Sequence, residues 1–167
     1  FVSAVFYILQ AMIQNSKRSL ATGYLLLATA VIVLSIAAYQ RNAVWQDGMS
    51  LWEDVVRKSP QKARGHNNLG IAYYNKGLTD KAIEHYQIAL RINPNYAEAH
   101  NNLGNDYKDK GLTDMAIEHY QIALRIKPDC AEAYNNLGLA YKDKGLTDMA
   151  IEHYQIALRI KPDYAEA

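Results

Sequence analysis

The sequence is poor in cysteine and in net charge, and it lacks the residue sets that build catalytic sites. Cys130 is the single cysteine among 167 residues, so an internal disulfide and a cysteine metal site are both excluded. The net charge of +1 does not match the positive charge typical of nucleic-acid-binding proteins. No serine–histidine–aspartate or cysteine–histidine set, glycine-rich phosphate loop or pair of catalytic carboxylates is recognisable. We therefore expect a non-catalytic stretch of chain with no metal, no cofactor and no nucleic-acid partner.

Charge and hydropathy divide the chain near residue 62. The part up to Lys62 has six Lys and Arg against three Asp and Glu, a net +3, whereas the rest has twelve against fourteen, a net −2. No charged residue lies between Ser19 and Gln40. Twenty helical residues span about 30 Å, the thickness of the hydrocarbon core of a bilayer. We therefore predict a transmembrane helix over 20–40. The alternative is a buried core helix, for which a short soluble domain offers no covering surface.

A second apolar run, 1–13, is too short to cross a bilayer alone. Since the chain starts inside it and without methionine, we interpret it as the end of an earlier span, joined to the next by the loop 14–19. Lys17 and Arg18 in this loop favour the cytoplasmic side. The sequence thus predicts an integral membrane protein, with a transmembrane region over 1–42 and the later chain on the non-cytoplasmic side, in a periplasm or lumen.

From Ala63 onwards the sequence repeats with a period of 34 residues. The units 97–130 and 131–164 differ at four positions, and 63–96 is a more divergent copy. Residues 165–167 match the start of a further, truncated unit. A fixed period of this length is typical of arrays of helical hairpins.

Each unit contains the pattern of two helices. In the third unit we expect Asp129 to cap the first helix and Gly145 to end it in the left-handed conformation. Thr147 or Asp148 would cap the second helix, which stops before Pro162. Small residues would let the two helices approach closely, and tyrosines would fill the remaining space. The predicted contact stripes are Tyr134, Leu137, Gly138 and Tyr141 on the first helix, and Ala150, Tyr154 and Ala157 on the second.

This pattern of Leu-Gly, Tyr, Ala, aromatic, Ala and Pro resembles the tetratricopeptide repeat (TPR) family. The resemblance covers Ala63–Ala167 and implies an all-α solenoid that binds other proteins. In two units a histidine, His66 or His100, stands where that family often has an aromatic residue. Asp106 departs further, because the other units have alanine at this small, partly buried position. Either Asp106 is more exposed than the pattern implies, or the middle unit is locally destabilised.

The junction 43–62 carries a partial copy of the repeat. A shift of 34 residues aligns Trp52, Val55 and Pro60 with Tyr86, Ala89 and Pro94. Ser50-Leu51-Trp52-Glu53 also matches a capping box. We therefore predict that Ser50–Lys58 is the second helix of a divergent half-repeat whose tryptophan packs under the array and covers its apolar end.

The candidate binding surface is the concave face formed by the first helices, where short extended peptides lie in TPR proteins. An asparagine pair recurs there, and each amide offers both a donor and an acceptor to a peptide backbone. The array is similar to the TPR region of O-linked N-acetylglucosamine transferases, which implies that the second asparagine of each pair grips the substrate backbone. The alternative is that asparagine simply suits a solvated helix face. The candidate peptide-binding residues are Asn67, Asn68, Asn101, Asn102, Asn135 and Asn136, with Lys108 and Lys142, and with Asp109, Asp143, Glu98 and Glu132, flanking the groove.

A histidine ladder on the second helices, His85, His119 and His153, lies beside glutamates at positions 84, 118 and 152. A metal site needs three or four ligands that converge on one point, whereas each pair here is alone in its unit. We interpret these residues as solvated side chains on the outer face.

Three functions fit the sequence. The leading hypothesis is a membrane-anchored TPR scaffold that binds a peptide or protein in its concave groove. The segments Arg41–Asp47 and Leu51–Asp54 resemble the membrane-to-TPR junction of transmembrane-TPR O-mannosyltransferase-like proteins. That resemblance implies the acceptor-recruiting C-terminal part of a multi-pass glycosyltransferase. The third is an array that self-associates through its open repeat ends.

Overall fold

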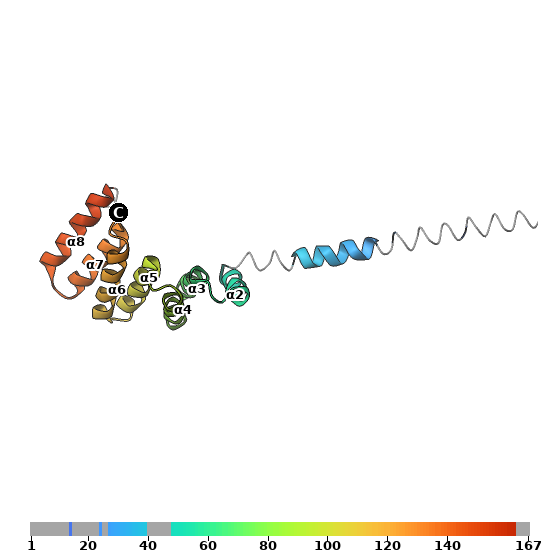
Figure 1. Cartoon of the computed structure of the whole chain (residues 1–167), viewed down its shortest axis with the longest axis horizontal. Helices are drawn as coiled ribbons and strands as arrows, with labels where there is room; N and C mark the ends of the chain where they lie inside the picture. Colours follow the sequence, from blue (N-terminus) through green and yellow to red (C-terminus); the bar gives the residue numbers. More distant parts are fainter. Residues whose placement is uncertain (1–13, 15–23, 25–26, 40–47, 163–167) are drawn as a thin grey trace, which may run out of the picture. The chain divides into compact units, whose positions relative to one another are not determined.

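The chain is described here by a computed structural model, which covers residues 14, 24, 27–39 and 48–162 and divides into two units, Phe1–Asp47 and Gly48–Ala167. In the first unit, residues 27–39 are helical and all are exposed; Figure 1 draws them in blue. The rest of the predicted transmembrane helix 20–40, apart from residue 24, lies outside the described residues, as do the run 1–13 and most of the loop 14–19. Within the described residues, no helix is long and apolar enough to cross a membrane.

The second unit is an all-α solenoid, which confirms the predicted fold class for this part of the chain. Each helix packs against its neighbours in sequence, and α3 and α5 also contact the next first helix along the array. Figure 1 shows the helices following one another in chain order as three hairpins behind a single leading helix. The helices of this unit are α2 (Gly48–Lys58), α3 (Ala63–Asn75), α4 (Thr79–Ile92), α5 (Ala97–Asp109), α6 (Thr113–Ile126), α7 (Ala131–Asp143) and α8 (Thr147–Ile160).

The first helix of every hairpin ends at a left-handed glycine, as predicted for Gly145. Gly145 has φ of +76°, and the equivalent Gly77 and Gly111 have φ of +74° and +75°. The amide of Gly145 donates to the carbonyl of Lys142 at 2.9 Å, and that of Leu146 donates to Tyr141 at 2.9 Å. These two bonds form a Schellman motif, which satisfies the last carbonyls of the helix and turns the chain back.

The predicted side-chain caps at the helix starts are wrong. Cys130, not Asp129, is the N-cap of α7, and Leu146 is the N-cap of α8; neither makes a side-chain cap hydrogen bond. Thr147 and Asp148 therefore lie in the first turn of α8, where the negative charge favours the helix dipole. The regular bonds of α8 begin at its N-cap, where the carbonyl of Leu146 accepts from the amide of Ala150 at 3.0 Å.

The predicted stripes pack as glycine against tyrosine. A Cβ atom on Gly104 would lie 2.6 Å from Cε1 of Tyr120, and one on Gly138 would lie 2.6 Å from Cε1 of Tyr154. Since carbon atoms do not approach so closely, the tyrosine ring occupies the space that any other residue would need. The core continues through alanines and leucines, of which Ala82, Ala116, Leu103 and Leu137 are at most 2 % exposed.

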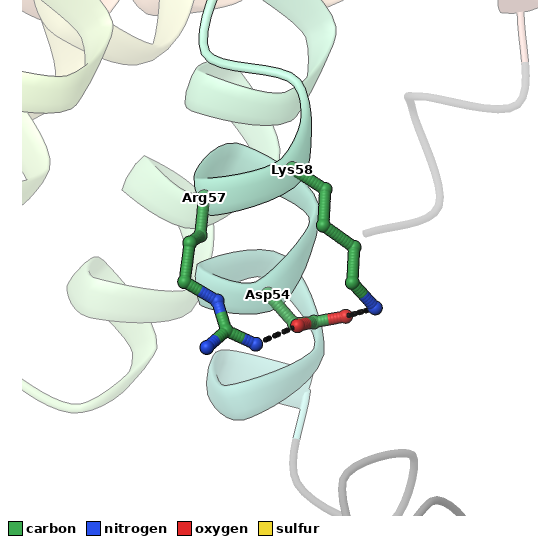
Figure 2. A network of polar contacts seen from close by, with 3 residues as sticks. All are labelled: Asp54, Arg57 and Lys58. Atoms are coloured by element: carbon green, nitrogen blue, oxygen red, sulfur yellow. Dashed lines mark hydrogen bonds and ion pairs between the residues drawn. The ribbon is translucent and has the colours of Figure 1, made fainter.

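The helix α2 leads into the array. It begins at Gly48, so Ser50 lies inside it and the predicted capping box does not start the helix. Trp52 and Val56 pack against the core of the hairpins. Figure 2 shows that Asp54 pairs with Arg57 and with Lys58, the latter at 2.5 Å, along the exposed side of this helix. The hydrogen bond to Lys58, and then that to Arg57, lowers the pKa of Asp54 below its usual value.

Contacts of α2 repeat those of the later second helices. The hydroxyl of Tyr73 donates to Oε1 of Glu53 at 2.9 Å. One repeat later, Gln87 donates to the hydroxyl of Tyr107 at 3.2 Å, and Gln87 stands 34 residues after Glu53. Glu53 thus takes the place of Gln87 at the leading end of the array.

Candidate functional site

A groove of about 530 Å³ opens between the first helices, where α3 and α5 face the start of α7. Four of the predicted asparagines line it in two adjacent pairs, Asn67 with Asn68 and Asn101 with Asn102. The turn that follows α4 adds Tyr96, and Ile71 adds an apolar surface. The groove therefore combines amides with an aromatic ring and aliphatic side chains, a lining suited to an extended peptide.

The asparagines also join neighbouring hairpins to one another. Nδ2 of Asn102 donates to Oδ1 of Asn67 at 3.1 Å, and Nδ2 of Asn136 donates to Oδ1 of Asn101 at 3.1 Å. Asn67 and Asn101 are 3 % and 5 % exposed, so these two are buried by the contact. Asn67 and Asn101, each the first asparagine of its pair, are thus structural links between repeats.

Charges of both signs surround the groove. Nζ of Lys127 lies 3.8 Å from Oε1 of Glu98, and Nδ2 of Asn101 donates to Oε1 of Glu132 at 2.9 Å. Arg64 adds a second positive side chain from α3. Because two positive and two negative side chains line the groove, it favours neither a strongly acidic nor a strongly basic peptide.

Several predicted residues lie outside this groove. Lys108 is half-buried and Lys142 is exposed, and neither is among the residues that line it. Asn135 is half-buried, and Asn136 instead bonds Asn101 and Asn105. Sequence reasoning missed Arg64, Tyr96 and Lys127, which lie at turns and helix ends where the spacing of helical faces carries no signal; these three residues line the groove with the asparagines.

A second, smaller hollow of about 220 Å³ lies further along α3 and α5. Asp106 is one of its lining residues and is 1 % exposed, so the expectation that it is more exposed than the pattern implies is wrong. Local destabilisation of the middle unit stays a prediction. Its Oδ2 atom is buried and has no hydrogen-bond partner among the described residues. Burial, followed by the nearby Asp109, raises the pKa of Asp106 to about 7.

The sequence predicted that the histidine ladder is solvated, and this is wrong. The three histidines lie half-buried between the two helices of each hairpin. Nδ1 of His66 lies 3.0 Å from Nδ1 of His85, and Nδ1 of His100 lies 2.9 Å from that of His119, with stacked rings. In the third unit Tyr134 stacks on His153, whose Nδ1 is buried with no partner in the described chain. No group of three metal-ligating side chains lies within the described ranges.

Comparison with known proteins agrees with this geometry. The model of the tetratricopeptide repeat matches residues 63–96 and 131–164, and a second TPR repeat model matches 104–145. No curated protein matches the chain.

Two solved structures of a protein named MamA are similar to this chain. Both are 32 % identical over 77 % of this chain, with TM-scores of 0.65 and 0.63, and the matches cover 75 % and 70 % of the MamA chains. With the hairpins, the left-handed glycines and the glycine–tyrosine packing described above, these matches show that the chain belongs to the tetratricopeptide repeat family.

Proposed function

We propose that this chain is a membrane-anchored TPR scaffold that binds an extended segment of a partner protein in the groove between α3 and α5. Tetratricopeptide repeats serve protein–protein interaction and are typically not enzymes. The observation that carries the proposal is the row of asparagines along the 530 Å³ groove. An amide can accept from a backbone N–H and donate to a backbone C=O, so it holds a peptide without regard to its side chains.

Asn68 is the best residue for a test of peptide binding. It lines the groove, and its Oδ1 accepts only a long bond of 3.4 Å from Asn67, whereas Asn102 also links two repeats. Peptides selected from a displayed random library on the full chain in detergent would serve as ligands. One lost hydrogen bond is worth about 1 kcal/mol, so Asn68→Ala should weaken binding about five- to tenfold.

The matched control is Asn95→Ala, an exposed asparagine in the turn after α4 that does not line the groove. It should leave both binding and thermal stability unchanged. Equal affinities of the Asn68→Ala variant and the unaltered chain for every selected peptide would contradict the proposed groove.

The proposed anchor rests on the apolar helix of the first unit. Its side chains are exposed on all sides, including Val33 at 63 % and Leu34 at 69 %. Burial of apolar area stabilises by about 25 cal/mol per Å², so a helix of this composition is strongly favoured in lipid over water. The full chain should stay in the membrane fraction after alkaline carbonate extraction, and external protease should reach the repeats from the non-cytoplasmic side only. Release by carbonate would refute the anchor, and cleavage from the cytoplasmic side would refute the orientation.

Self-association is a second candidate function, favoured by the apolar surface of α8. Ile151 is 48 % exposed and Leu158 is 37 % exposed, whereas Leu124, the equivalent of Leu158 in α6, is 9 % exposed. A second copy that packs on α8 would bury this surface. Sedimentation of the full chain in detergent should then show an oligomer that Leu158→Lys dissociates, whereas a monomer at all concentrations would exclude it.

The glycosyltransferase alternative rests on the residue pattern of 41–54, of which 41–47 lie outside the described residues. A gene sequence with many upstream spans and an acidic first loop would favour it, and one or two anchors would favour the scaffold.

A further inference from the structure

The smaller hollow near Asp106 differs from the peptide groove in one respect: it contains a carboxylate that the repeat does not require. The same position holds Ala72 in the first unit and Ala140 in the third, and both fit the hairpin. The neighbouring residue, Asn105, is also polar only in the middle unit, where the others have Ile71 and Leu139. The fold therefore tolerates an apolar lining at both positions.

The Oδ2 atom of Asp106 is buried without a hydrogen-bond donor among the described residues. The whole residue is 1 % exposed. An unpaired buried polar atom costs about 1–3 kcal/mol, more when it carries a charge. The other units have alanine at this position, so the fold does not need a carboxylate here. The buried carboxylate of Asp106 therefore points to a ligand that donates the missing hydrogen bond.

The other residues of the hollow also suit a positive charge. Tyr74, Tyr86 and Asn102 line it, and none of the residues that line it is basic. The hydroxyl of Tyr120 donates to Asn105 at 2.7 Å, but the corresponding acceptor for Tyr86 is replaced by Ile71, which cannot accept. The aromatic rings attract a cation through their faces, and the oxygen atoms accept its N–H groups.

A second acid, Asp109, lies close to the hollow without lining it. The hydroxyl of Tyr74 donates to Oδ2 of Asp109 at 2.8 Å and thereby ties α3 to α5 beside Asp106. Among the residues that line the cavity of about 220 Å³, Asp106 carries the one carboxylate. This volume admits a single side chain and not a folded segment.

We propose that this hollow is a specificity subsite that takes the cationic side chain, lysine or arginine, of a peptide bound along the same helices. The proposal rests on the proposed peptide-binding function, because the subsite shares Ile71 and Asn102 with the larger groove. The cation is seated over the carboxylate of Asp106 and supplies the hydrogen-bond donor that Oδ2 lacks among the described residues. The groove then binds the backbone of a peptide of any sequence, and the subsite selects a lysine or arginine at the peptide position beside α5.

Binding in this subsite depends on pH. Tyr74, Tyr86 and Tyr120 act on Asp106 from the helices packed against it. Asp109 on its own helix and Lys110, the C-cap of that helix, act on it too. The tyrosines stay neutral near pH 7, since burial or a carboxylate raises the pKa of each. With a pKa of about 7, Asp106 is mostly neutral at pH 6 and mostly ionised at pH 8, and the ionised form attracts the cation.

The test uses three amino-acid probes, Nα-acetyl-lysine methylamide, its arginine counterpart and the uncharged norleucine analogue of equal length. Each is titrated into the full chain in detergent while the carboxyl carbon resonance of Asp106 is followed by NMR. We expect the lysine or arginine probe to bind at least tenfold more tightly than norleucine, and about tenfold more tightly at pH 8 than at pH 6. Asp106→Asn and Asp106→Ala should abolish both differences, whereas Glu118→Gln, an exposed acid on α6, should keep them.

Equal binding of the charged and uncharged probes would overturn the subsite, as would a charge preference that survives in Asp106→Ala. Extended serine–glycine peptides with one central lysine or norleucine separate this proposal from the peptide groove. If they bind through Asn68 without a charge preference, the groove stands and the subsite is refuted. If the lysine probe binds through Asp106 but the extended peptide gains no affinity over it, the subsite stands and the groove is refuted.

Discussion

Two residues in the middle hairpin, Asp106 and Gly104, show how single positions set the stability of this array. Asp106 places a carboxylate where the other hairpins have alanine, and its pKa is raised to about 7 because it is buried. In the unfolded chain the carboxyl has its usual pKa near 3.8, so between these values the folded state binds the proton more tightly. Its contribution to stability is therefore most favourable below pH 4 and is lost as the pH rises through 7.

Replacing Asp106 with alanine, as in the neighbouring repeats, should stabilise the chain. The gain should be about 1–3 kcal/mol at pH 8, where the unpaired charge is present, and smaller at pH 5. Chemical denaturation at the two pH values measures it. A destabilised Asp106→Ala variant at pH 8 would show that the carboxylate has a partner in the fold.

Gly104 stabilises the middle hairpin because it has no Cβ atom. A Cβ there would lie 2.6 Å from the ring of Tyr120, which is fully buried and cannot move aside. Gly104→Ala should thus destabilise by about 1–3 kcal/mol in thermal or chemical denaturation.

Gly65 provides the control for this prediction. A Cβ at Gly65 would meet Val55 and Val56 at 3.4 and 3.6 Å, which is ordinary contact. Gly65→Ala should therefore be neutral or stabilise by up to about 1 kcal/mol, through helix propensity. Equal effects of the two substitutions would contradict the glycine–tyrosine packing.

Within each hairpin, the contact between the two helices includes a ring pair that responds to pH. In the first hairpin His66 also lies 3.0 Å from the carbonyl of Pro60 through Nε2, so that nitrogen carries the proton and Nδ1 can accept from His85. His100 repeats this arrangement with Pro94 and His119. In each pair the accepting ring must be neutral, since two protonated Nδ1 atoms would both be donors. Burial lowers the pKa of His85, His100 and His119 accordingly.

Because these histidines have lowered pKa values in the folded state, the unfolded chain binds more protons below about pH 6.5. Stability is therefore complete above this pH and falls as the pH decreases. Replacing His66 and His100 with tyrosine, as at Tyr134 in the third hairpin, should flatten the loss of thermal stability between pH 6.5 and 5. As a control, exchange of two exposed arginines, Arg91 and Arg125, for lysine should leave the pH dependence of thermal stability unchanged. The same pH dependence in the tyrosine variant as in the unaltered chain would contradict this account.

The array as a unit depends on its leading helix, because a solenoid is held by contacts between neighbours and its ends need covering. Trp52 and Met49 of α2 pack against the core, and Glu53 bonds Tyr73 in α3. The opposite end has no such cover within the described residues, and Ile151 of α8 is 48 % exposed there. The two ends of the array should therefore differ in local stability.

Trp52→Ala should remove about 2 kcal/mol, less than the loss for a fully buried tryptophan because the ring is only half-buried. Hydrogen exchange resolved by helix should show the loss in α3 and α4 and little change in α7 and α8. Glu53→Gln is the control, since Gln87 and Gln121 donate to the hydroxyls of the equivalent tyrosines in later hairpins. Uniform loss of protection along the array would contradict nearest-neighbour coupling.

Repetition in the sequence was sufficient to predict the helical hairpins, the stripe of Leu137 and Tyr141, the left-handed Gly145 and the helix around Trp52. Each of these follows from local spacing and backbone conformation, which the residues themselves dictate. The position of the asparagines on the first helices follows in the same way.

Contacts between helices were decided by the tertiary structure. The histidines fall on the solvated side of a single helix, and only the second helix of the hairpin buries them in pairs. The first asparagine of a pair becomes a link between repeats because a neighbouring repeat presents its amide there. Whether Asp106 is exposed or buried depends on the closure of α3, α4 and α5 around it, which residue spacing within one helix does not contain.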